Sequence, residues 1–158
     1  FDQPGFTEYA YGYLPNDRRH RFKLWGSVDL SDAFTIGTNL SLQSPRKLSC
    51  LGYHPTDPFA NAYGAASHYC GGQPAPRGEG YETDWITQFD IALRYNIEVP
   101  TGQTVTLRAD VFNLFNSQGI QERDETGELG VGVADLNYGN PSSYQTPRYV
   151  RLGFDIAF

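Results

Sequence analysis

The chain has 158 residues, enough for one domain with its own core, and it carries 12 Lys and Arg against 18 Asp and Glu. The resulting net charge of −6 excludes a general nucleic-acid-binding protein. Two cysteines are too few for a disulfide-stabilised scaffold, and no stretch approaches the roughly 18 consecutive apolar residues of a membrane-spanning helix.

Five segments alternate between apolar and other residues with a period of two, which indicates β-strands. They cover about 20–30, 33–43, 84–97, 103–115 and 148–158. One face of each segment is uncharged, whereas the opposite faces carry Arg21, Lys23, Asp29, Asp90, Arg94, Arg108, Asp110, Arg151 and Asp155. Helical periodicity is weak throughout. The sequence therefore predicts an all-β fold, an antiparallel meander of about five long strands without a substantial helix.

These segments are longer than the strands of soluble proteins, which average about 5–6 residues. A strand of about 11 residues, rising about 3.3 Å per residue and tilted by about 45°, reaches a height of about 25 Å, which is the apolar band of an outer-membrane barrel. Trp85 and Tyr95 share one uncharged face, and the same geometry separates them by roughly 23 Å in height. We expect these two side chains to form aromatic girdles at the two membrane interfaces.

The connections between the segments alternate between short and long. Tight turns are expected at 31–32 and at about 98–102, whereas 44–83 and 116–147 are long loops rich in Gly, Pro, Asn, Asp and Tyr. Residues 1–18 are expected to be the end of a further long loop. Short turns on one rim and long loops on the other are typical of transmembrane barrels, with the turns in the periplasm and the loops outside the cell.

Three stretches carry a resemblance to a known family: Leu14-Pro-Asn-Asp-Arg-Arg-His-Arg-Phe-Lys-Leu-Trp-Gly-Ser-Val-Asp-Leu30, Arg108-Ala-Asp-Val-Phe-Asn-Leu-Phe-Asn116 and Pro147-Arg-Tyr-Val-Arg-Leu-Gly-Phe-Asp-Ile-Ala-Phe158. With them the chain resembles the C-terminal end of TonB-dependent outer-membrane receptors, in particular the Oar-like group. The second and third stretches are similar to the penultimate and last strands of these receptors.

The resemblance implies that residues 1–158 are the C-terminal part of a roughly 22-stranded barrel in the outer membrane of a Gram-negative bacterium, without its plug domain, TonB box and preceding strands. It implies active transport of a bulky solute of unknown identity, with no enzyme activity, no cofactor and no nucleic acid. The expected partners are outer-membrane lipid, the rest of the barrel and plug, the TonB system reached through the missing N-terminal part, and the barrel-assembly machinery. Five strands alone leave two open edges, whose unpaired amides are costly in lipid. The strands are therefore expected to be part of a larger barrel, to be held by other chains, or to form an open sheet in solution.

The last predicted strand alternates regularly and ends on an aromatic residue. Its uncharged side chains are Val150, Leu152, Phe154, Ile156 and Phe158. Such an ending resembles the signal that the barrel-assembly machinery reads by adding an exposed edge strand to its own sheet. The alternative is an ordinary edge strand that ends on Phe.

Cys50 and Cys70 lie 20 residues apart in one predicted loop, and we expect a disulfide between them. Closing a loop of about 20 residues stabilises a fold by roughly 3 kcal/mol in the chain-entropy model. A tetrahedral zinc site with His54 and His68, in the pattern C-x3-H-x13-H-x-C, is the alternative, but its last spacing is cramped. Free thiols are the third possibility, and no metal is expected.

Six charged residues on the polar faces are expected to point into the barrel lumen: Asp90, Arg94, Arg108, Asp110, Arg151 and Asp155. We expect cross-strand ion pairs that hold the plug or lumen water. Acid–base catalysis is disfavoured because no histidine or serine nucleophile shares this face, so no catalytic residue is assigned. The acidic segment 122–128 lacks the ligand spacing of an EF-hand and is expected to be a solvated loop.

The tyrosines of the long loops either stack on a solute or pack one loop against another: Tyr53, Tyr63, Tyr69, Tyr81, Tyr138 and Tyr144. Two other classes of protein compete with the membrane hypothesis, a soluble β-sandwich that binds a ligand or carbohydrate and a β-rich hydrolase. Half-buried soluble strands also alternate. The membrane hypothesis requires lipid against the uncharged faces, so a closed interior containing Phe89, Leu107 and Phe154 contradicts it.

Overall fold

The computed structural model describes residues 3–158, which form two compact units. The sheet unit contains residues 20–43, 86–118 and 145–158. The loop unit contains residues 3–19, 44–85 and 119–144. Among residues 3–158, no helix has the length and hydrophobicity needed to span a bilayer.

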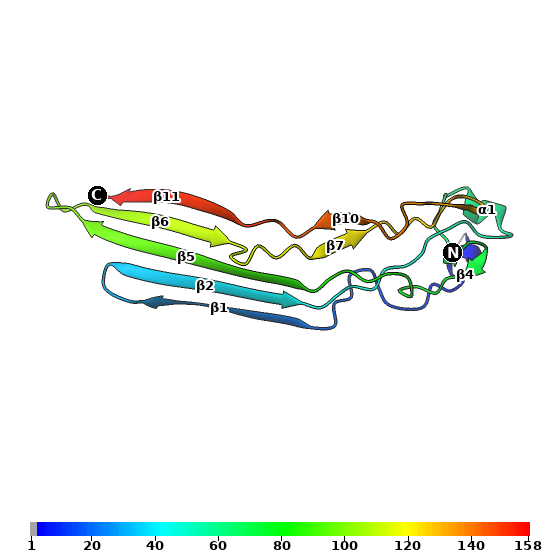
Figure 1. The fold of residues 1–158 in the computed structure, drawn as a ribbon, viewed down its shortest axis with the longest axis horizontal. Coiled ribbons are helices and arrows are strands. Elements are labelled where there is room, and N and C mark those ends of the chain that lie inside the picture. The colour runs from blue at the N-terminus through cyan, green and yellow to red at the C-terminus, as the bar shows by residue number, and fades with distance from the viewer. Residues whose placement is uncertain (1–2) are drawn as a thin grey trace. The chain divides into compact units, whose positions relative to one another are not determined.

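The sheet unit is a five-stranded antiparallel sheet. Its strands are β1 (Arg21–Asp29), β2 (Phe34–Gln43), β5 (Ile86–Glu98), β6 (Thr104–Phe112) and β11 (Tyr149–Ala157). Their order in the sheet is β1-β2-β5-β6-β11, so each long strand pairs with the next long strand along the chain (Figure 1). The predicted all-β class and the antiparallel meander of five long strands are therefore confirmed.

Two tight turns connect neighbouring strands at the predicted positions. Between β1 and β2, the Phe34 amide donates to the Ser31 carbonyl at 3.2 Å and to the Ser31 hydroxyl at 3.1 Å. Between β5 and β6, the Gly102 amide donates to the Val99 carbonyl at 2.9 Å, with Pro100 as the second residue of the turn. Proline presets the φ angle of this position, and Gly102 adopts a φ of 88° without strain.

The strand register places the uncharged residues of all five strands on the same face of the sheet. One cross-strand row consists of Val28, Ile36, Leu93, Ala109 and Leu152. The neighbouring row contains Phe34, Tyr95, Leu107 and Phe154. We call this side of the sheet the uncharged face and the opposite side the polar face.

The loop unit has short elements of its own, which were not predicted from the sequence. They are a 3-10 helix η1 (Pro4–Phe6), the helix α1 (Pro58–Asn61) and six short strands, β3 (Tyr69–Cys70), β4 (Gln73–Pro74), β7 (Ile120–Arg123), β8 (Glu128–Gly130), β9 (Val133–Ala134) and β10 (Pro141–Tyr144). The strands form three two-stranded sheets, β3 with β4, β8 with β9 and β7 with β10. The Asp57 carboxylate caps α1 by accepting from the Phe59 amide at 2.9 Å, and Pro58 starts the helix.

The loop unit also has a small core. Leu48, Cys50, Ala60 and Tyr69 are buried within it.

The three segments of the loop unit carry 12 acidic and 6 basic residues in the full sequence, whereas the sheet-unit segments carry 6 of each. The whole net charge of −6 therefore belongs to the loops, and the strands are neutral in sum.

Candidate functional site

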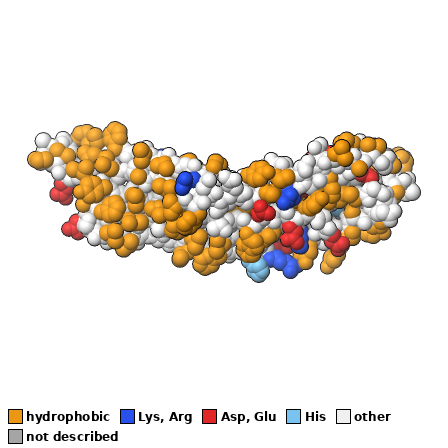
Figure 2. All heavy atoms as spheres, viewed as in Figure 1, with side chains coloured by type: hydrophobic (Ala, Val, Ile, Leu, Met, Phe, Trp, Pro, Cys, Tyr) orange, Lys and Arg blue, Asp and Glu red, His pale blue; other side chains and the backbone are white. Residues whose placement is uncertain are grey.

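The uncharged face of the sheet exposes many large apolar side chains. Large apolar side chains on it are exposed, with 69% exposure for Phe154, 75% for Leu152 and 45% for Leu107. Figure 2 shows hydrophobic side chains gathered over the five strands. Within the described residues of this unit, no second layer of strands or helices packs on the sheet. Phe89, Leu107 and Phe154 therefore share no closed interior in their own unit.

Two strands form the edges of the sheet, β1 on one side and β11 on the other. Among residues 3–158, neither has a partner strand on its outer side. The side chains assigned to the assembly signal all lie on β11 or directly after it and are exposed: Val150, Leu152, Phe154, Ile156 and Phe158. The structure therefore presents this segment as an open edge, and its recognition by an assembly machinery remains a prediction.

The six charged residues assigned to the lumen lie together on the polar face. Arg151 donates to Asp110 Oδ2 through Nε at 3.0 Å and Nη2 at 2.7 Å, directly across the β6–β11 pair. Arg108 Nε forms an ion pair with Asp155 at 2.7 Å. Arg94 lies opposite Arg108 in the register, so a positive pair sits beside these ion pairs. That this face lines a lumen remains a prediction.

Asp90 and Asn113 form a polar junction that sequence reasoning missed. Asp90 accepts hydrogen bonds from Asn39 Nδ2 at 3.0 Å, from Gln88 Nε2 and from the Asn113 amide at 2.9 Å. Asn113 is only 3% exposed, and its Nδ2 donates to the carbonyl groups of Ser117 and Thr146. Its φ of 49° ends β6 at Phe112, earlier than the predicted limit at 115, because left-handed backbone cannot continue a strand.

The two residues predicted to form the aromatic girdles belong to different units of the structure. Tyr95 lies within β5, opposite Phe34 on β2, and is 48% exposed. Trp85 directly precedes β5, is 55% exposed and belongs to the loop unit. Their placement at two membrane interfaces remains a prediction.

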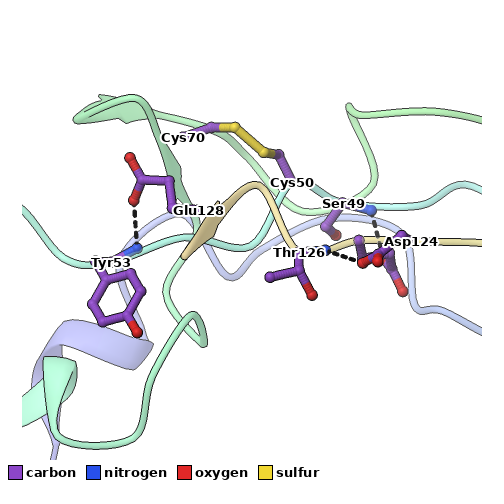
Figure 3. Close-up of a disulfide and its surroundings, with 8 residues drawn as sticks. Ser49, Cys50, Tyr53, Cys70, Asp124, Thr126 and Glu128 are labelled. Carbon is purple, nitrogen blue, oxygen red and sulfur yellow. Dashed lines mark hydrogen bonds between the residues drawn. A yellow bond between two sulfur atoms is a disulfide. The ribbon is translucent and has the colours of Figure 1, made fainter. Parts of the chain in front are cut away.

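The loop unit contains a disulfide between Cys50 and Cys70, with their Cα atoms 6.0 Å apart (Figure 3). The two sulfur atoms pack against Gly127, where any side chain would collide with both of them. The Gly127 amide donates to the Leu51 carbonyl at 2.7 Å, which joins the loop after β6 to the loop after β2. The disulfide therefore lies at the contact between the two long loops.

Carboxylates from the acidic segment strengthen this contact. Glu125 Oε1 accepts from the Ser49 amide at 2.7 Å. Glu128 Oε2 accepts from the Tyr53 amide at 2.7 Å (Figure 3). Glu122 pairs with Arg46, and Asp124 Oδ1 accepts from the Thr126 amide at 2.8 Å. The expectation of a simply solvated loop was wrong for Glu128, which is 2% exposed. These carboxylates bind backbone amides of the unit and one arginine.

His54 and His68, the two histidines of the first long loop, contact groups other than the cysteines. His54 Nδ1 accepts from the amides of Thr56 and Asp57, and its Nε2 lies 3.2 Å from Glu8 Oε2. His68 Nε2 lies 3.3 Å from Arg77 Nε. Within residues 3–158, no group of three or more His, Cys, Asp or Glu side chains is arranged to hold a metal ion.

The first segment of the loop unit is attached through Glu8. Tyr69 Oη donates to Glu8 Oε2, and this bond, together with that of His54, lowers the pKa of Glu8 below its ordinary value. The same bond to the carboxylate, with burial, raises the pKa of Tyr69 to about 12. Burial, with the nearby Arg77 charge as a second cause, lowers the pKa of His68. Glu8 therefore ties the segment before β1 to the first long loop.

Several loop tyrosines pack one segment against another. Tyr81 and Tyr138 have ring centroids 5.0 Å apart, and burial followed by Tyr81 raises the pKa of Tyr138. Tyr69 meets Tyr9 edge to face at 5.4 Å, and Tyr63 meets Phe6 in the same way. These contacts favour the packing role that the sequence left open.

Comparison with known proteins gives one informative likeness. No protein-family profile matches the chain, and no solved structure matches it. The chain is 27% identical to the TonB-dependent transporter Oar of Myxococcus xanthus over an alignment of 202 positions. This alignment includes the whole chain but only 18% of the length of that transporter. The family suggested by the three sequence stretches is thus supported by a distant similarity along the full chain.

Proposed function

We propose that this chain supplies five adjoining wall strands and the outer loops of a TonB-dependent transporter in the outer membrane of a Gram-negative bacterium. The full-length similarity to the Oar transporter supports this class. The observation that carries the proposal is the uncharged face, whose rows are in register across all five strands and exposed. No charged residue interrupts these rows.

Lipid accounts for both faces of the sheet. Exposing apolar surface to water costs about 25 cal/mol of free energy for each Å². Contact of the same surface with hydrocarbon removes this cost. The polar face carries the ion pairs of Arg151 with Asp110 and of Arg108 with Asp155, as a wall toward a water-filled lumen requires. A soluble β-sandwich instead needs a second layer on the uncharged face, and the described sheet unit has none.

The open edges extend the proposal to the rest of the barrel. Unpaired backbone groups are costly in hydrocarbon, so neighbouring strands of the barrel pair with β1 and β11. In the complete transporter, the polar face lies toward the plug, and the TonB system supplies the energy for passage of a bulky solute. β11 with Phe158 serves as the assembly signal, and Trp85 and Tyr95 mark the membrane interfaces. The loop unit takes part in solute capture outside the cell.

Epitope accessibility on intact cells tests this arrangement. One tag is inserted at Gly132, between β8 and β9, and a matched tag at Gly102, between β5 and β6, because both glycines have positive φ and open space around them. In the full-length protein, antibody is expected to bind intact cells with the tag at 132, but cells with the tag at 102 only after permeabilisation. Equal accessibility of both tags, or absence of the protein from the outer-membrane fraction, would contradict the proposal.

A further inference from the structure

The loop unit contains a cavity of about 460 Å³ that none of the sequence motifs indicates. It forms where the segment before β1 crosses the first long loop. Its lining residues are Tyr11, Gly12, Tyr13, Arg19, Arg77 and Glu79.

Two glycines allow the two segments to cross closely. A side chain at Gly12 would collide with the Arg77 carbonyl oxygen, and a Cβ at Gly78 would lie 2.8 Å from the Tyr13 Cβ. The Arg77 amide donates to the Tyr9 carbonyl at 3.0 Å, which fixes the crossing. Because the backbones meet without side chains between them, the neighbouring long side chains surround the open space.

The two arginines of the cavity are held in place by neutral partners. The Arg19 guanidinium lies 4.6 Å from the Tyr13 ring centroid and donates to the Tyr13 hydroxyl. Arg77 Nε donates to Nε2 of His68, which is 5% exposed. Burial lowers the His68 pKa, so at neutral pH the ring is uncharged and accepts this bond at Nε2.

The positive charges of Arg19 and Arg77 lack direct ion-pair partners within the part of the chain that the structure describes. The fixed Nε of Arg77 leaves its two terminal nitrogens as a planar pair of donors, which matches the two oxygens of a carboxylate. Glu79 contributes one negative charge to the lining, so the cavity keeps a net positive charge within an acidic loop unit.

An aromatic ring completes the lining. Tyr11 is 97% exposed, so most of its ring is free to contact a ligand. A flat ring beside guanidinium groups suits a ligand with an apolar plane next to its anionic group.

We propose that this cavity binds a solute carboxylate attached to a flat apolar group, with Arg77 and Arg19 holding the carboxylate and Tyr11 contacting the apolar part. The inference gives a ligand chemistry to the loop unit, and it rests on the proposed function only for the statement that such solutes reach the cavity from outside the cell.

Benzoate is the probe, titrated by calorimetry or ligand-observed NMR into the full-length protein purified in detergent. Arg77→Met is expected to weaken benzoate binding by about tenfold or more, because a charge-assisted pair of hydrogen bonds is lost. Arg77→Lys keeps the charge without the planar donor pair and is expected to recover only part of the affinity. Tyr11→Ser, at a fully exposed position, is expected to weaken binding about threefold without affecting folding.

Lys47→Met is the matched control, since it removes a cation of the same unit that pairs with Glu82 outside the cavity. It is expected to leave benzoate affinity unchanged. Benzyl alcohol and methyl glucoside, which lack a carboxylate, are expected to bind at least about tenfold more weakly than benzoate. Inorganic phosphate, an anion without a ring, is expected to bind more weakly as well.

Three results would overturn the inference: no saturable benzoate binding, equal loss of affinity in Lys47→Met and Arg77→Met, or methyl glucoside binding as tightly as benzoate. The epitope experiment distinguishes this failure from failure of the proposed function. A protein with its loops outside the cell but without benzoate affinity overturns only the ligand assignment.

Discussion

Leu152→Arg is the sharpest test of which face of the sheet contacts lipid. Leu152 is the fourth residue of the nine-residue strand β11, is 75% exposed and belongs to the row that contains Leu93 and Ala109. With about 3.4 Å per residue and a tilt of about 45°, it lies only a few Å from the middle of the bilayer. Arginine at such a depth on a lipid face destabilises a barrel by about 2–4 kcal/mol, which lowers the folded-to-unfolded ratio about 30- to 900-fold.

The adjacent Gly153→Arg is the matched control. Gly153 points to the polar face, has open space for a Cβ atom and lies opposite Arg108. Its expected cost is below about 1 kcal/mol, from repulsion between like charges across the strand pair. The assay is denaturant unfolding of the full-length protein refolded in lipid vesicles, compared at a constant m value. Equal costs for both substitutions, or a larger cost for Gly153→Arg, would refute the assignment of the faces.

Three further predictions concern the loops and the last strand. In a thiol titration, denatured but unreduced protein is expected to show no reactive thiol from Cys50 or Cys70. Reduction of the disulfide is expected to destabilise the loop unit by roughly 3 kcal/mol. Two reactive thiols before reduction would contradict the disulfide. Because the pKa of His68 is lowered in the folded state, the loop unit is expected to be fully stable above pH 6.5 and less stable below it. The lowered pKa of Glu8 adds a further loss of stability below pH 4.5. Near-ultraviolet circular dichroism of the tyrosines measures both effects, and a circular dichroism signal that stays constant down to pH 4 would contradict this prediction. Phe158→Ala in the full-length protein is expected to reduce the amount assembled in the outer membrane, measured by fractionation, and unchanged assembly would favour an ordinary edge strand.

The long strands were predictable because a sheet with one uncharged face imposes a period of two on the sequence. Within β5, Phe89, Ile91 and Leu93 alternate with Gln88, Asp90 and Ala92, and the register places them on opposite faces. The turn at 99–102 was predictable for a local reason, since proline and glycine restrict or permit particular φ angles. Both signals depend on residues that are near one another in the sequence.

The fold of the loop unit was not predictable in this way. Its contacts join residues that are far apart in the chain, such as Glu128 with the Tyr53 amide and Glu8 with Tyr69, and no periodic pattern records them. The short helix α1 did carry a local signal, the Asp57 cap followed by Pro58, but four residues are too few to show a helical period.

Some features of the candidate sites also follow from local sequence patterns, whereas others depend on contacts between residues far apart in the chain. The charges of the polar face followed from alternation, whereas their pairing, such as Arg151 with Asp110, depends on the strand register. The Asn113 junction has only one sequence signal, an asparagine at the end of a strand pattern, since asparagine tolerates left-handed backbone. The cavity beside Arg77 has none, because it arises from two segments that cross in space.

The most direct test of the central claim is the environment of a spin label on each face of β11. Phe154→Cys and Gly153→Cys place the label on neighbouring residues of the uncharged and the polar face, and the bonded Cys50 and Cys70 do not compete for labelling. In the full-length protein in lipid vesicles, the label at 154 is expected to collide readily with oxygen and little with a water-soluble nickel complex. The label at 153 is expected to show the opposite preference. Exclusion of both reagents at 154, as in a closed protein interior, would contradict the account.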